Sequence, residues 1–126
     1  MRYLVDTTFL IDHLRGDEAA ADRLGRMLAS GDEVFINEVV ACEAWFGASA
    51  DDDPSLRTLL ETFEFVQPGP DSARLAGRWR ANARRRGWAL SLSHALIAAA
   101  AAAVDGAILT RNVRDFALTP VPVETY

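Results

Sequence analysis

At 126 residues the chain has the length of one domain, since single cores are usually built from roughly 100 to 150 residues. Half of its residues are hydrophobic and a quarter are charged, a composition that excludes a disordered or fibrous protein. All 13 basic residues are arginine, and the net charge of −5 excludes binding to a phosphate backbone by bulk charge alone. We therefore expect one globular domain, residues 1–126, in which contact with nucleic acid depends on a local arginine patch or on bound cations.

Neither a targeting segment nor a membrane segment is expected. The first residues, MRYLVD, reach a charge too soon for a signal peptide, and the single cysteine, Cys42, cannot form an internal disulfide. The longest apolar run, residues 95–104, is about half of the roughly 20 residues that a membrane-spanning helix needs. These features predict a cytoplasmic protein with no membrane association.

In the first half of the chain, short apolar runs alternate with segments of helical spacing. Strands are predicted at residues 3–5 and 34–36. Helices are predicted at residues 7–15, 17–30, 38–48 and 53–63. Asn37 and Asp53 are suitable N-caps, and Pro54 is favourable at the first helical position.

The second half continues the alternation. A weaker strand is predicted at residues 65–67, then a long helix at residues 71–86 that Gly87 ends, and an alanine-rich helix that Ser91 or Ser93 caps. Further strands are predicted at residues 107–110 and 121–123, the last at a sheet edge because of its neighbouring prolines. The pattern predicts an α/β fold, in which a mainly parallel sheet is covered by helices on both faces and ligands bind beyond the carboxyl ends of the strands.

Asp6 directly follows the first predicted strand. Its carboxylate would stand at the carboxyl edge of the sheet, where open α/β sheets bind ligands. An aspartate before a helix is also a common N-cap, so the sequence leaves both interpretations open.

Glu43 lies inside the predicted helix 38–48. Helical spacing predicts that it shares an apolar face with Val39, Val40, Phe46 and Gly47. A charge on such a face is costly unless a cation or hydrogen bonds compensate it, which makes Glu43 a candidate metal ligand. A surface glutamate whose carboxylate reaches water is the alternative.

The segment TRNVRDF begins at the end of a predicted strand. It supplies Thr110, Asn112 and Asp115 as oxygen ligands or hydrogen-bond partners at the sheet edge that holds Asp6, although such residues are also common in turns. Together with Asp6 and Glu43, these groups suit Mg²⁺ or Mn²⁺, which can activate water and neutralise charge on a phosphodiester.

Four segments resemble the PIN-domain ribonucleases, and in particular the VapC toxins. They are YLVDTTFLIDHLRG, NEVVACEAWFGA, GWALSLSHALIAAA and GAILTRNVRDF, in this order along nearly the whole chain. The resemblance implies a three-layer α/β/α sandwich, a divalent-metal site built from acidic residues, and cleavage of structured RNA. It also implies a homodimer and inhibition by a cognate VapB-like antitoxin.

The resemblance assigns roles position by position. Asp6, Glu43 and Asp115 match acids of the family, and Thr8 and Asn112 match polar positions near the metal. Where the family usually has a further acid, before the ALIAA stretch, this chain has His94. Imidazole can bind Mn²⁺ but suits Mg²⁺ poorly, so we expect His94, as a ligand, to alter metal preference or to weaken activity. A structural role for His94 is the alternative.

Two groups of residues are candidate contacts with partners. The helix before Gly87 carries Trp79 among the arginines Arg78, Arg80, Arg84, Arg85 and Arg86. Because arginine binds phosphate and carboxylate in a bidentate manner, this helix is a candidate contact for RNA or antitoxin, with a solvated face as the alternative. Trp45 and Phe46 are adjacent, so only one of them can face the core, and the other favours the homodimer or the antitoxin contact.

The sequence leaves three alternative hypotheses for the function. The first is the endoribonuclease toxin of a type II toxin–antitoxin pair, in which Asp6, Glu43 and Asp115 hold Mg²⁺ or Mn²⁺ and a metal-activated water attacks RNA. The second is a PIN-like module that binds antitoxin or RNA and is catalytically impaired by His94. The third, a phosphatase or phosphotransfer domain using Asp6, would need a lysine near the phosphate, and the chain has none.

Overall fold

The strands form one parallel sheet in the order β3-β2-β1-β4-β5. This computed structural model describes residues 1–66 and 69–126. The strands are β1 (Arg2–Val5), β2 (Glu33–Ile36), β3 (Glu64–Phe65), β4 (Ala107–Leu109) and β5 (Val123–Glu124). The helices are α1 (Thr7–Leu14), α2 (Glu18–Ala29), α3 (Glu38–Phe46), α4 (Pro54–Glu61), α5 (Pro70–Arg85) and α6 (Leu92–Ala103), with a 3-10 helix at Val113–Phe116.

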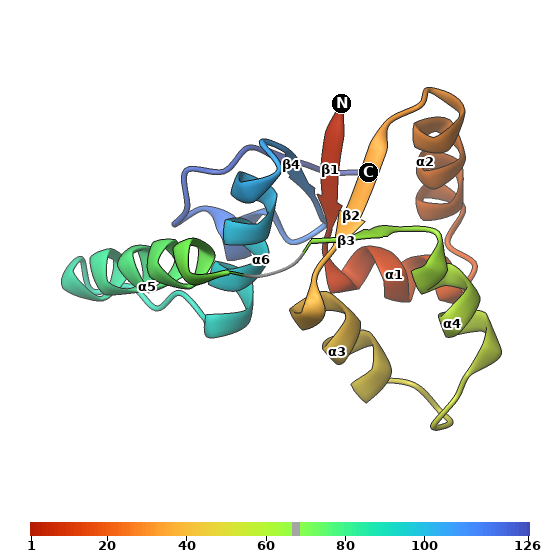
Figure 1. Ribbon diagram of the computed structural model, residues 1–126, viewed down its shortest axis with the longest axis horizontal. Coiled ribbons are helices and arrows are strands. Elements are labelled where there is room, and N and C mark those ends of the chain that lie inside the picture. The colour runs from red at the N-terminus through yellow and green to blue at the C-terminus, as the bar shows by residue number, and fades with distance from the viewer. Residues whose placement is uncertain (67–68) are drawn as a thin grey trace.

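Helices cover both faces of the sheet. Figure 1 shows α5 and α6 on one side of β1 and β2, and α2 on the other, while α1 and α3 begin where β1 and β2 end. The predicted α/β fold with a mainly parallel sheet and three layers is confirmed. No helix in the described part of the chain is both long and apolar enough to cross a membrane.

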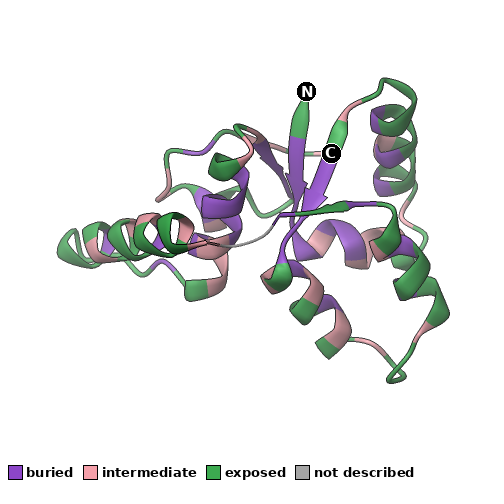
Figure 2. Cartoon of the chain, in the orientation of Figure 1, coloured by how far each residue is buried: buried purple, intermediate pink, exposed green. Residues whose placement is uncertain are grey.

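The central strands are buried on both faces. Leu4, Val5, Ile36, Ile108 and Leu109 have no measurable exposure, and Figure 2 shows β1 and β2 buried except at their first residues. Strands with helices on both faces are expected to be continuously apolar rather than alternating, which is why short runs such as YLV form them.

Local capping explains where most helices begin. The side chains of Asp6, Asp17, Asn37, Asp53 and Ser91 each accept a hydrogen bond from a backbone N–H in the first turn of the following helix. Of the two serines predicted as the cap of α6, Ser91 is the one used. Gly87 follows α5 with φ of +81°, a conformation that costs glycine little, and it ends this helix as predicted.

The strands predicted at residues 3–5, 34–36 and 107–110 differ from the structure by one residue at one end, and the other two predicted strands differ more. The strand predicted at residues 121–123 is β5, Val123–Glu124, because the ladder pairs Ile108 with Val123 and Pro122 has no N–H to donate. The strand predicted at residues 65–67 is β3, Glu64–Phe65, and Gln67 lies outside the described residues.

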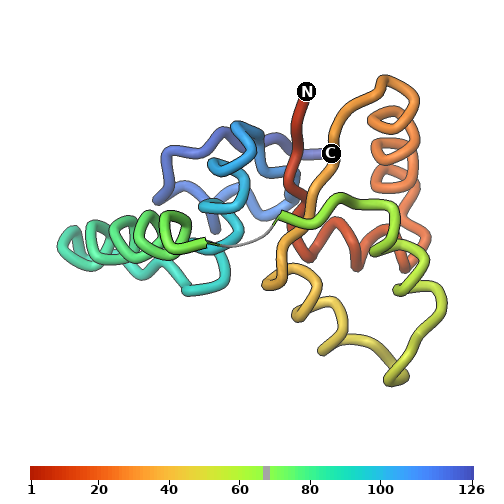
Figure 3. The backbone as a smooth tube through the Cα atoms, in the orientation of Figure 1, coloured from red at the N-terminus to blue at the C-terminus, as the bar shows by residue number. Residues whose placement is uncertain are grey.

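The direction in which the chain adds strands to the sheet reverses between β1 and β4. From β1 the chain proceeds through β2 to β3 on one side, and then returns to place β4 and β5 on the other side of β1. The path can be followed along the tube in Figure 3, and Figure 1 labels β2 and β4 on opposite sides of β1. Ligands of open α/β sheets bind at such a switch point, outside the carboxyl ends of the two strands.

Candidate active site

Asp6 lies at this switch point. It follows β1 directly, only 3% of its surface is exposed, and its backbone N–H donates to the carbonyl of Leu109 in β4 at 3.0 Å. Its Oδ1 accepts the backbone N–H of Thr7 at 2.8 Å. Asp6 is therefore the N-cap of α1, and the same carboxylate also stands at the carboxyl edge of the sheet, where open α/β sheets bind ligands.

Hydroxyl groups from both strand ends hold the other oxygen of Asp6. Its Oδ2 accepts Thr110 Oγ1 at 2.8 Å and Thr8 Oγ1 at 3.2 Å. Thr110 is fully buried, and its Oγ1 accepts the backbone N–H of Asn112 at 2.9 Å. The predicted residues Thr8 and Thr110 thus contact Asp6, and Asn112 is linked to it only indirectly, through its backbone bond to Thr110.

Glu43 is linked to Asp6 through one residue. Its Oε1 accepts the hydroxyl of Thr7 at 2.7 Å, while the backbone N–H of the same threonine donates to Asp6. The prediction that Glu43 lies on an apolar helix face is wrong, since Glu43 is exposed and Phe46, one turn later, is 92% exposed. A hydrogen bond and water therefore compensate its charge.

His94 and Asp115 lie side by side. His94, in the first turn of α6, has Nε2 3.5 Å from Oδ2 of Asp115 in the 3-10 helix, and both side chains are partly exposed. The edge of the His94 ring also packs on Phe116, with centroids 5.1 Å apart. His94 is thus in contact with the acid that the resemblance places in the site.

A second group of polar side chains meets around Arg111, the residue after Thr110, and was not identified from the sequence. Arg111, directly after Thr110, places Nε 2.9 Å from Asp12 and Nη2 2.9 Å from Asp17, and its guanidinium stacks on the ring of Tyr126 at 4.8 Å. The Tyr126 hydroxyl donates to Asp12 at 2.6 Å. Burial, together with this hydrogen bond, raises the pKa of Tyr126 to about 12.

The missed residues had only weak sequence signals. Thr7 follows the key aspartate and carries a hydroxyl at the first helical position, but its partner is 36 residues away. Tyr126 and Asp12 are 114 residues apart. Only the strand order brings such pairs together.

The donor set fits a hydrated hard cation. A carboxylate offers about four acceptor positions, and Asp6 uses three of them for hydrogen bonds, so capacity for a further partner remains. Across residues 1–66 and 69–126, histidine, cysteine and carboxylate side chains form no group of three or more that could hold a metal ion. Mg²⁺ is often bound by one or two carboxylates while it keeps several waters, so Asp6 with a neighbouring acid suits it.

The predicted contact arginines lie apart from these acids. Arg78, Arg84 and Arg85 are exposed on α5 and Arg86 is exposed at its end. Within the described part of the chain, none of them forms an ion pair with Asp6, Glu43 or Asp115.

Two known proteins are similar to this chain in sequence. Ribonuclease VapC19 of Mycobacterium tuberculosis is 34% identical to this chain over 117 residues, which cover 93% of this chain and 94% of VapC19. A toxin–antitoxin complex from Klebsiella pneumoniae contains a chain that is 29% identical, with a TM-score of 0.79 and coverage of 98% of this chain and 96% of that one.

The fold itself is shared more widely. A chain in the structure of VapBC2 from Rickettsia felis, bound to a DNA fragment from its promoter, superposes with a TM-score of 0.87 over 100% of this chain and 99% of that one, at 19% identity. Ribonucleases of the PIN family generally use a divalent metal ion. The family model of the PIN domain matches residues 3–121, and the chain therefore belongs to the PIN-domain family.

Proposed function

We propose that this protein is a metal-dependent endoribonuclease that acts in the cytoplasm as the VapC-like toxin of a type II toxin–antitoxin pair. The observation that carries this proposal is the buried carboxylate of Asp6 at the switch point between β1 and β4, held by donors from both strand ends. The 34% identity to Ribonuclease VapC19 supports the same conclusion from sequence.

Asp6 with a neighbouring acid, Glu43 or Asp115, is proposed to hold hydrated Mg²⁺ or Mn²⁺, with His94 at the margin of the site. When bound, such an ion supplies positive charge for the phosphodiester and activates water. Thr8 and Thr110 orient Asp6, because both hydroxyls donate to its Oδ2. Thr7 couples Glu43 to Asp6, because its hydroxyl and its backbone N–H donate to one acid each. Asn112 ties the segment after β4 to Thr110.

The proposed partners are an RNA substrate, a VapB-like antitoxin and a second copy of the chain. Support comes from VapC19, named as a ribonuclease, and from the similar chains in toxin–antitoxin complexes. The exposed ring of Phe46 beside the partly buried Trp45 offers an apolar contact for a partner.

The test is RNA cleavage by Asp6→Asn. Asparagine can still cap α1 through its oxygen, and its NH₂ would face hydroxyl groups that can rotate to accept, so the fold should be retained. Because a neutral amide binds a hard cation poorly, we expect cleavage to fall at least about 100-fold, as when a principal transition-state interaction is removed.

The matched control is Asp22→Asn, which removes an exposed carboxylate on α2 that pairs with Arg26. This control should cleave like the parent. Metal-dependent cleavage by Asp6→Asn at the parent rate would overturn the proposal, provided that circular dichroism shows all three proteins folded.

A second candidate function is binding without efficient cleavage. It is favoured by the place of His94 in contact with Asp115, since the imidazole stands where the resemblance implies a further acid and the site has one carboxylate fewer for Mg²⁺. RNA binding by the parent without cleavage in either Mg²⁺ or Mn²⁺ would favour this candidate over the enzyme.

A further inference from the structure

Most arginines of this chain either form an ion pair or lie on α5 and at its end, and over the described residues only Arg15 and Arg114 do neither. Over the described residues, five of them form ion pairs with acids: Arg2, Arg23, Arg26, Arg57 and Arg111. None of the six on α5 and at its end forms such a pair: Arg74, Arg78, Arg80, Arg84, Arg85 and Arg86. In a chain with a net charge of −5, acids are plentiful, yet none within the described residues neutralises this helix.

The charge of α5 is therefore locally positive. Its only acid is Asp71, in the first turn, whereas the arginines extend to the last turn and to the C-cap. All six arginines are exposed. Unpaired guanidinium groups on one helix favour binding of an external polyanion, because arginine binds phosphate in a bidentate manner and the groups repel one another without it.

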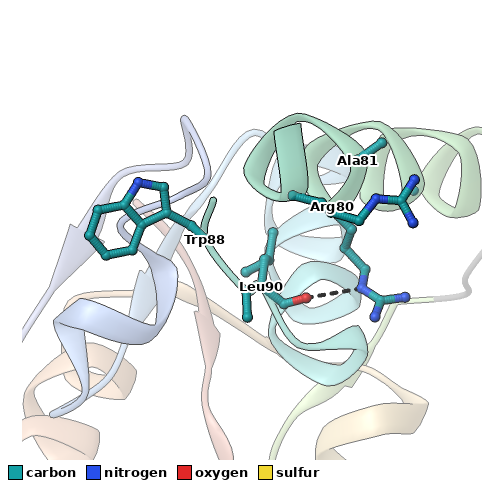
Figure 4. A pocket seen from close by; sticks show the side chains of 7 residues that line it. Arg80, Ala81, Trp88 and Leu90 are labelled. Carbon is teal, nitrogen blue, oxygen red and sulfur yellow. Dashed lines mark hydrogen bonds between the residues drawn. The ribbon is translucent and has the colours of Figure 1, made fainter. Parts of the chain in front are cut away.

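A shallow hollow lies between this helix and the loop that follows it. It has a volume of about 350 Å³ and is lined by Arg80 and Arg84 from α5 and by the segment Trp88–Leu90. Figure 4 shows Arg80 bonded to the carbonyl of Leu90, at 3.0 Å, with the ring of Trp88 pointing away on the far side. Trp88 is 61% exposed, an unusual position for tryptophan without a partner.

The hollow adjoins the candidate active site along the chain. The segment Trp88–Leu90 leads directly to Ser91, the N-cap of α6, and His94 in the next turn contacts Asp115. Alanines of α5 pack on alanines of α6, which fixes the two helices against each other. The lining of the hollow and the contact between His94 and Asp115 are therefore connected by the short stretch of chain from Trp88 to the first turn of α6.

We propose that this surface, made by Arg78, Arg84, Arg85, Arg86 and Trp88, binds single-stranded RNA that flanks the cleavage site. In this proposal, which rests on the proposed function, the arginines bind phosphates and Trp88 stacks on a base. Trp88 follows the arginines at the end of α5, and its backbone N–H donates to the carbonyl of Ala83 at 2.9 Å, so the exposed ring lies at the end of the helix that carries Arg84 and Arg85. Exposed aromatic rings together with arginines bind single strands without sequence preference. An acidic protein segment would use the arginines but has no need of a stacking surface, so the observations favour RNA.

The test measures binding separately from cleavage. A fluorescent single-stranded RNA of about 12 nucleotides is titrated by anisotropy in EDTA, with the full-length parent and with Asp6→Asn. The double variant Arg84→Gln/Arg85→Gln is compared with Arg26→Gln/Arg57→Gln, which removes the same charge from arginines that are exposed and paired elsewhere.

We expect the α5 variant to bind at least 10-fold more weakly than the control. Its plot of log affinity against log salt should be shallower by about 0.7 for each phosphate that the variant no longer binds. Trp88→Ala should weaken binding roughly 5- to 100-fold, whereas Trp88→Phe, which keeps a stacking ring, should weaken it less.

Equal binding by the α5 variant and the control would overturn the proposal, as would failure of the parent to bind the RNA. Unchanged RNA binding together with abolished binding to a poly-glutamate probe would overturn it in favour of a protein contact. Arginine-dependent binding without cleavage would instead contradict only the proposed function, and cleavage with no dependence on these arginines would contradict only this inference.

Discussion

Thr110 is the residue through which β4 reaches Asp6. Its buried hydroxyl donates to Asp6 Oδ2 and accepts from the backbone of Asn112, so one small side chain orients the carboxylate and starts the following turn. The nearly isosteric change Thr110→Val removes both bonds without creating a cavity.

Because a hydrogen bond to a charged group contributes about 1.5 to 3 kcal/mol, Thr110→Val should lower the free energy of unfolding by about that amount, measured by urea denaturation. RNA cleavage should fall with it, since Asp6 would no longer be oriented by this hydroxyl. Thr110→Ser keeps the hydroxyl and should retain most of the activity. If Val and Ser variants cleaved equally well, the hydroxyl would have no positioning role.

We expect His94 to influence which metal the site prefers. Its Nε2 lies 3.5 Å from Oδ2 of Asp115, and the resemblance to the VapC toxins implies an acid at the position of His94. His94→Asp should therefore raise Mg²⁺-dependent cleavage more than Mn²⁺-dependent cleavage, because carboxylate oxygen suits Mg²⁺ better than imidazole nitrogen does.

The measurement is the cleavage rate of the parent, His94→Asp and His94→Ala in each metal. His94→Ala separates the loss of the imidazole from the gain of a carboxylate. Equal Mg²⁺ activity in the parent and the Asp variant would place His94 outside the metal site.

At the scale of elements, the segment after β5 is tied to α1. Tyr126 donates to Asp12 on α1, packs edge-on against Phe9 at 5.0 Å, and carries Arg111 on its ring. These contacts join the ends of β4 and β5 to α1, the helix that Asp6 caps, and so they stabilise the position of α1 next to the switch point.

Tyr126→Phe keeps the ring contacts and removes only the hydroxyl. The expected loss is about 1.5 kcal/mol of unfolding free energy at neutral pH, a typical value for a hydrogen bond to a charged group. A double-mutant cycle with Asp12→Asn should assign most of that loss to this pair. Additive losses in the cycle would show that the bond contributes nothing.

The same bond predicts a pH dependence. Because the folded state raises the pKa of Tyr126 from 10.0 to about 12, the stability from its protonated phenol is present below pH 10 and is lost as pH rises through about 12. Tyr126→Phe should flatten the fall in stability between pH 10 and pH 12, leaving the contribution of Tyr3, whose pKa burial also raises.

At the scale of the whole molecule, α3 exposes an apolar residue at its end. Phe46 is 92% exposed next to Trp45, which packs against the core. We expect a homodimer at tens of micromolar protein, measured by light scattering, because aromatic residues such as Phe46 are enriched in protein–protein interfaces.

Phe46→Ser should shift the protein toward the monomer and leave its melting temperature nearly unchanged at low concentration. Leu28→Ser, on the exposed face of α2, is the matched control and should remain dimeric. A monomeric parent at this concentration would contradict the prediction.

The sequence by itself determined the elements of this protein and the position of its main acid. Strands that are buried on both faces need apolar runs, and helices need N-caps, and both signals are local in the sequence. The succession of strands and helices along the chain was therefore predictable, and so were the caps Asn37, Asp53 and Asp6. The place of Asp6 at the carboxyl edge also followed, because it depends only on the end of β1.

Only the tertiary structure decided which strands are neighbours and which side chains meet. The order β3-β2-β1-β4-β5 brings Thr110 to Asp6 over 104 residues and Tyr126 to Asp12 over 114. It also showed that Glu43 is exposed and bonded to Thr7 rather than set on an apolar face. Such contacts arise from the packing of distant segments around one core, which no local spacing of residue types specifies.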